Sequence, residues 1–88
     1  MLGLALRILF AAAAVTTVAA IVVYVDGKIT RRKLQKKLRE NGIQDGLIEA
    51  IDHCNNVVSM KDMESDKKLE IHGDDVDYDL DEGDRIYV

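Results

Sequence analysis

The chain has 88 residues, a formal net charge of −4 and a single cysteine, which excludes an internal disulfide. This length leaves room for one small domain beyond any membrane segment. The charge is segregated, because residues 26–42 carry +5 (seven basic against two acidic residues) and residues 43–88 carry −10 (four basic against fourteen acidic residues).

The first 25 residues predict a transmembrane helix that acts as a signal anchor. No residue from Ile8 to Val25 is charged, and a helix of this length spans ~27 Å, close to the ~30 Å hydrocarbon core of a bilayer. A buried helix of a soluble protein and a cleaved signal peptide, with a new amino terminus near Ile21, remain as alternatives. Small residues recur at a spacing that lets membrane helices pack and form homo-oligomers. These candidate packing residues are Ala12, Ala13, Thr16, Thr17 and Ala20.

A basic segment follows this run and predicts both orientation and lipid contact. Positive flanks stay cytoplasmic, so the amino terminus is expected outside the cell membrane and the carboxyl terminus in the cytoplasm. Thr30 is a candidate N-cap for a helix over residues 31–40, which carries Leu34 and Leu38 on one face. Lipid headgroups are expected to bind the cations, whereas nucleic acid is not, because no aromatic residue lies among them. The cations are Lys28, Arg31, Arg32, Lys33, Lys36, Lys37 and Arg39.

A second helix is expected over residues 44–54. Apolar side chains recur with a helical period from residue 43 onward, with Ile48 beside the stripe that they form. They are Ile43, Leu47, Ile51, Cys54 and Val58. The two helices are expected to pack as a hairpin, with Cys54 as a small core residue.

The remaining residues predict a short β-meander, because brief apolar or alternating runs are separated by turn signals. Its clearest strand covers residues 75–81, where Val76, Tyr78 and Leu80 would share one face. Residues 81–84 would form the last hairpin turn. Carboxylates line the opposite face of this strand and are the candidate residues for binding a protein partner. They are Asp75, Asp77, Asp79 and Asp81.

No catalytic residue, cofactor or metal is expected. An EF-hand loop that starts at Asp75 would need glycine at its sixth position, where Leu80 stands. The three soft metal ligands, His53, Cys54 and His72, lack the paired spacing of a zinc site. The sequence contains neither a glycine-rich phosphate loop nor a serine in a nucleophile elbow.

The patterns together predict an α+β fold in three parts: a transmembrane helix over residues 1–25, a basic juxtamembrane helix and turn over residues 26–42, and an acidic cytoplasmic module of one helix and a β-meander over residues 43–88. The expected function is that of a non-enzymatic adaptor or accessory subunit of a membrane complex. One alternative is a holin-like or toxin-like protein that permeabilises the membrane by oligomerising. A second, less favoured alternative is a secreted acidic protein.

Overall fold

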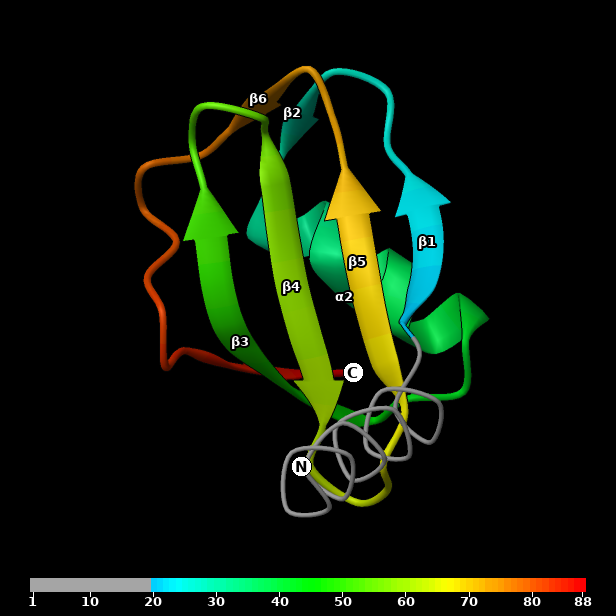
Figure 1. Ribbon diagram of the computed structural model, residues 1–88. Helices are drawn as coiled ribbons and strands as arrows, with labels where there is room; N and C mark the ends of the chain where they lie inside the picture. The colour runs from blue at the N-terminus through cyan, green and yellow to red at the C-terminus, as the bar shows by residue number, and fades with distance from the viewer. Residues whose placement is uncertain (1–19) are drawn as a thin grey trace, which may run out of the picture.

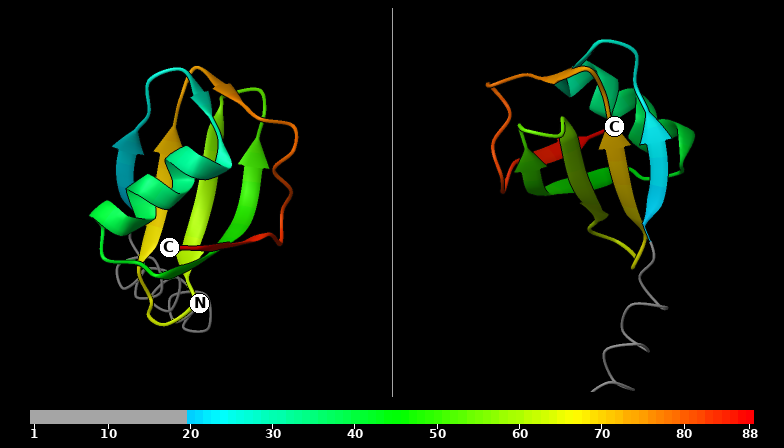
Figure 2. Two further views of the ribbon diagram at one scale, coloured as in Figure 1. Left: turned by 180° about the vertical axis from the view of Figure 1, so that it is seen from behind. Right: turned by 45° about the horizontal axis from the view of Figure 1, so that its top comes forward.

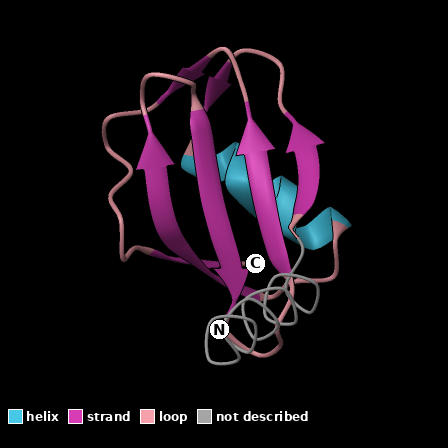
Figure 3. Cartoon of the chain, viewed as in Figure 1, coloured by secondary structure: helices cyan, strands magenta, loops and turns pink. Residues whose placement is uncertain are grey.

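A computed structural model describes residues 20–88, which form one helix and seven strands (Figures 1 and 3). Five strands build one sheet in the order β1-β5-β4-β3-β7, and β2 and β6 form a separate parallel pair. The strands β3, β4 and β5 are an antiparallel meander, while β1 runs parallel to β5. The elements are β1 (Ile21–Tyr24), β2 (Lys28–Ile29), α2 (Arg31–Glu40), β3 (Asp45–Asp52), β4 (Val57–Asp62), β5 (Lys68–His72), β6 (Asp75–Val76) and β7 (Arg85–Tyr87).

The helix α2 forms where the sequence predicts it. The Thr30 hydroxyl accepts the Lys33 N–H at 3.3 Å, which caps the first turn, and Asn41 ends the helix. Leu34 and Leu38 lie one turn apart and are fully buried against the sheet. The helix therefore covers one face of the sheet, as the view from behind shows (Figure 2).

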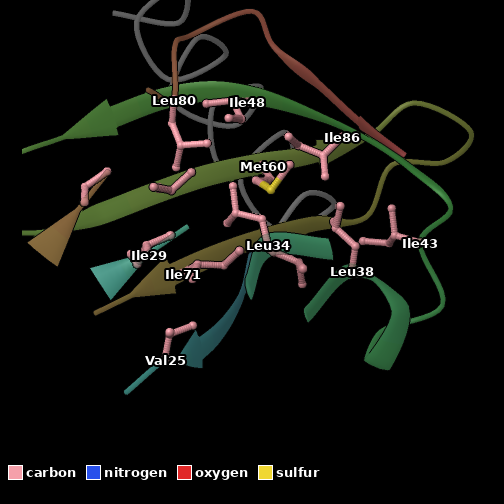
Figure 4. Close-up of a cluster of buried hydrophobic side chains, with 13 residues drawn as sticks. Val25, Ile29, Leu34, Leu38, Ile43, Ile48, Met60, Ile71, Leu80 and Ile86 are labelled. Atoms are coloured by element: carbon pink, nitrogen blue, oxygen red, sulfur yellow. The ribbon is translucent and has the colours of Figure 1, made fainter. Parts of the chain in front are cut away.

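The hydrophobic core lies between α2 and this face (Figure 4). Alternate residues of the central strands point into it, as the pleat of a strand requires. Ile29 of β2, Val76 of β6 and Leu80 of the segment before β7 also contribute to the core. The buried residues are Val25, Ile29, Leu34, Leu38, Ile43, Ile48, Val58, Met60, Leu69, Ile71, Val76, Leu80 and Ile86.

The prediction of a transmembrane helix over residues 1–25 is wrong at its carboxyl-terminal end, because Ile21–Tyr24 form strand β1 and pair with β5. β-branched and aromatic residues favour strands, and a short apolar run can belong to either type of element. Within residues 20–88 no helix has the length and apolarity needed to cross a membrane. The predicted single-pass transmembrane helix therefore has no support within the described residues. Residues 1–19 lie outside the described residues, so the expected orientation stays a prediction.

The second predicted helix, residues 44–54, is also wrong, because this segment forms strand β3. Gly46 and Ile48 face α2, whereas Cys54 is exposed in the turn after the strand instead of lying in the core. A Cβ on Gly46 would lie 2.9 Å from Leu38 Cδ1, so the glycine allows α2 to approach the sheet closely. Pairing with β4 on one side and β7 on the other outweighs the local helical period.

The predicted acidic strand ends at Val76, and residues 77–84 form an irregular segment that we call the acidic strap. Its turn is closed by the Leu80 N–H, which donates to the Asp77 carbonyl at 3.2 Å. The Asp77 carboxylate accepts the Asp79 N–H at 3.0 Å, and such local bonds compete with a strand ladder. Leu80 is therefore buried while Tyr78 is 79% exposed, so the two do not share a face. No hairpin forms at residues 81–84, because β7 pairs with β3.

Candidate functional site

The outer edge of β1 carries backbone groups that pair with no strand of residues 20–88. The Val25 N–H donates to the His72 carbonyl at 2.7 Å, so the backbone N–H of Val25 points toward β5. Backbone groups of successive strand residues point to opposite sides, which turns those of Ile21 and Val23 toward β5 and those of Val22 and Tyr24 outward. Within residues 20–88 no strand pairs with this outer edge. As far as these residues extend, the edge is open to an additional strand.

The opposite edge of the sheet is covered by the chain itself. The Gln35 side chain donates to the Tyr87 carbonyl on β7 at 2.9 Å. Farther along, the Glu82 carboxylate in the acidic strap accepts the Ile51 N–H of β3 at 3.0 Å. The strap backbone also bonds to Ile48 on the same edge. Among the described residues the two edges therefore differ, because the chain covers the β7 and β3 edge but not the β1 edge, which we call the bare edge.

The side chains of β1 are apolar and exposed. Ile21 is 42% exposed, Val22 is 48% exposed and Tyr24 is 72% exposed. Natural proteins commonly place charges or proline on edge strands to prevent them from pairing with other chains. The edge strand β7 follows this rule with Arg85, whereas β1 contains neither a charge nor proline. An edge strand without charge or proline can pair with a strand of another chain.

No family model, curated protein or solved structure matches the chain. The function is therefore inferred from the geometry.

The face of the sheet opposite α2 is not covered by any element of residues 20–88 (Figure 1). Tyr24, His72 and Val57 lie in register across this face. The Tyr24 and His72 rings are 5.3 Å apart, and His72 Nε2 lies 2.8 Å from a Glu70 carboxylate oxygen. A shallow groove of about 670 Å³ follows the face. It is lined by Ala50, Ile51, Asp52, Asn55, Val57, Ser59, Glu70 and His72.

A second hollow, which we call the lysine cleft, lies between β1 and α2. It measures about 310 Å³ and is lined by Tyr24, Val25, Asp26, Lys33, Lys36 and Lys37. The Lys33 ammonium donates to the Asp26 carbonyl, and Lys37 forms an ion pair with Glu40 at 3.3 Å. Lys36 is exposed and forms no ion pair within the described part of the chain. The cleft therefore holds more positive than negative charge beside the bare edge.

The remaining predicted lipid-binding cations lie outside this cleft. Arg31 forms an ion pair with Asp84 at 3.3 Å, and Lys28 lies in β2. Arg32 and Arg39 are exposed and make no ion pair with any residue from 20 to 88. The structure gathers six of the seven predicted cations on α2, and lipid binding stays a prediction.

The predicted partner-binding carboxylates are divided between β6 and the acidic strap. Asp75 lies in β6 and accepts the Val76 N–H at 2.9 Å. Asp79 and Asp81 are exposed, whereas Asp77 is half-buried and stabilises the turn of the strap. These carboxylates do not form one strand face, and their role in partner binding stays a prediction.

Four of the predicted helix-packing residues, Ala12, Ala13, Thr16 and Thr17, lie outside the described residues. The fifth, Ala20, is exposed directly before β1. The sequence pattern predicts that the residues of β1 belong to the membrane helix. Their β-branched and aromatic composition was the available signal for a strand.

The histidines and the cysteine do not converge on one site. His53 stacks on Tyr78 with ring centroids 4.5 Å apart, on the acidic strap side, and Cys54 is exposed in the neighbouring turn. Among residues 20–88 no group of three or more His, Cys, Asp or Glu side chains could hold a metal ion.

The covered edge is held in part by a bidentate ion pair that makes stability depend on pH. Arg85 Nε donates to Asp45 Oδ1 at 2.9 Å, and a second guanidinium nitrogen binds Oδ2. The hydrogen bonds and charge of Arg85 lower the pKa of Asp45 below its ordinary value of 3.8. The folded-state pKa is below the unfolded one, so the pair stabilises the fold above about pH 4. This contribution is lost as the pH falls through the lowered pKa.

We expect the Asp45→Asn variant to unfold at a lower temperature than the parent chain at pH 7, and the difference to shrink toward pH 2. The reason is that protonation of Asp45 removes the same ion pair in the parent chain. Thermal unfolding followed by circular dichroism from pH 7 to pH 2 measures the effect. A constant difference over this range would show that the ion pair does not contribute.

Proposed function

We propose that residues 20–88 act as a non-enzymatic adaptor domain that binds an extended segment of a partner protein along the outer edge of β1. The contrast between the bare β1 edge and the covered edge opposite supports this proposal. In strand addition, main-chain hydrogen bonds provide affinity and alternate side chains provide specificity. The outward groups of Val22 and Tyr24 would make those bonds.

The apolar side chains of β1 favour the same mode of binding. A strand placed beside β1 would cover Ile21, Val22 and Tyr24, which are among the exposed large hydrophobic residues. Burial of apolar area stabilises a complex by about 25 cal/mol per Å² before the cost of ordering the peptide. The partner segment would extend the sheet by a sixth strand.

A second copy of the chain is the competing occupant. Antiparallel pairing of two β1 strands would form a symmetric dimer with one continuous sheet. Both copies of α2 would then lie on the same face of that sheet, with their lysine clefts on either side of the junction. Like charges repel, so the lysines of the two clefts favour a partner other than a second copy.

A proline at position 22 tests the proposed function. The Val22 N–H points away from β5, so Val22→Pro removes an outward donor and leaves the pairing of β1 with β5 intact. The probe is a fluorescent, end-blocked peptide of alternating valine and threonine, titrated with the full chain by anisotropy. We expect the variant to bind at least about tenfold more weakly, which corresponds to roughly 1.4 kcal/mol.

Tyr87→Pro is the matched control, because the Tyr87 N–H points outward from the covered edge. It should leave the peptide affinity within about twofold. Equal loss in both variants, or no binding by the parent chain, would contradict the proposal. A dimer in sedimentation equilibrium that dissociates only in Val22→Pro would assign the edge to a second copy.

A further inference from the structure

The bare edge of β1 and the lysine cleft are adjacent, although their residues come from different elements. Tyr24 belongs to both, since it is the last residue of β1 and lines the cleft. The lysines project from α2, which crosses behind the sheet and passes beside β1 (Figures 1 and 2). A strand added along β1 would therefore run past these ammonium groups.

The pleat decides which side chains of an added strand meet the lysines. In β1, the side chains of Ile21 and Val23 lie on the face that carries α2, whereas the side chains of Val22 and Tyr24 lie on the uncovered face. An added strand alternates in the same way, so every second side chain would point toward α2. Those side chains would reach the lysine cleft, and the others would extend the uncovered face.

The charge of the cleft selects acidic side chains. Three lysines line it, and the only carboxylate among its lining residues belongs to Asp26. Lys33 binds the backbone carbonyl of Asp26, so that bond leaves the ammonium charge unneutralised. The ion pair between Lys37 and Glu40 leaves Lys36 available to a ligand. A carboxylate in this position gains charge-assisted hydrogen bonds, while a lysine is repelled.

We propose that the β1 edge recognises extended partner segments with acidic side chains at alternate positions, and that the lysine cleft provides this selectivity. The inference rests on the proposed strand addition and defines the chemistry of the partner. A flat anionic surface fits less well, because the lysines line a hollow beside a strand edge. Arg32 and Arg39 on the same helix lie outside that hollow.

The test uses three end-blocked peptides in which valine alternates with glutamate, threonine or lysine. Each is titrated with the full chain, with a Lys36→Gln/Lys37→Gln double variant and with an Arg32→Gln/Arg39→Gln control of equal net charge. We expect the parent chain to bind the glutamate peptide at least about tenfold more tightly than the lysine peptide. The Lys36→Gln/Lys37→Gln variant should lose most of this preference, and the control should keep it.

The outcomes separate this inference from the proposed function. If Val22→Pro weakens all three peptides but the lysine substitutions change none of the ratios, strand addition stands and the charge selectivity is wrong. If Val22→Pro has no effect on any peptide, the proposed function fails. Vesicles of phosphatidylserine and phosphatidylcholine provide a further arm. Vesicle binding that both double variants weaken equally, together with no peptide preference, would assign α2 to a lipid surface and overturn the inference.

Discussion

Leu38→Ala is expected to lower the free energy of unfolding by about 2–5 kcal/mol, as truncation of a fully buried leucine does in other proteins. Leu38 is fully buried and contacts the sheet over Gly46, next to Met60 and Ile43 (Figure 4). The substitution leaves a cavity between α2 and the sheet. Urea denaturation followed by circular dichroism measures the loss. Arg39→Ala, an exposed change on the same helix, should stay within about 0.5 kcal/mol of the parent.

A second substitution shows whether the close approach of α2 causes this loss. In the parent chain, a Cβ on Gly46 would lie 2.9 Å from Leu38 Cδ1 and 3.0 Å from Met60 Cε, so Gly46→Ala should destabilise the fold. With Leu38→Ala the leucine methyl groups are gone, and the new methyl would partly fill the cavity. The double variant should therefore be more stable than the sum of the two single changes predicts. Simple additivity would contradict the observed packing of α2 on β3.

Val23→Pro is expected to destabilise the fold by about 1–3 kcal/mol, whereas Val22→Pro is expected to change stability little. The Val23 backbone faces β5, so proline there removes a ladder hydrogen bond and leaves a carbonyl of β5 without a donor. The Val22 N–H faces outward, a position where edge strands tolerate proline. Urea denaturation of the two variants compares neighbouring positions of one strand.

Hydrogen exchange supplies the control for this comparison. Amides of β5 next to β1 should lose protection in Val23→Pro and keep it in Val22→Pro, while amides of β3 should be similar in both variants. If position 22 proves to be the sensitive one, the outward assignment of its backbone groups is wrong. The proposed strand addition would then lose its structural basis.

The helix α2 could be predicted because its signals are local. Thr30 caps the first turn through its own side chain, and Leu34 and Leu38 lie on one face at helical spacing. Neither signal depends on residues far away in the sequence. The α+β composition beyond the first 25 residues, and the presence of short strands after residue 55, follow from similarly local patterns, whereas strands β1 and β3 do not.

Strands β1 and β3 were missed for a shared reason. The apolar residues 21–25 continue a longer apolar run, and the residues 43–54 carry a helical period, so local patterns alone favour helices. β1 becomes a strand because it pairs with β5. In this pairing Ile21 lies beside Leu69, which follows it by forty-eight residues in the sequence. β3 becomes a strand because β4 and β7 pair with it on both sides. Such long-range pairing leaves little trace in a short window of sequence.

The segregation of charge, and the basic helix that carries six of the seven predicted lipid-binding cations, can both be predicted from local sequence. The position of this helix beside the β1 edge, and of the acidic strap along the opposite edge, follows from the fold. An unpaired edge cannot be recognised locally because it is a property of the whole sheet. Whether the N–H of Val22 lacks a partner depends on which other strand occupies the neighbouring position, and that is settled only when the chain has folded.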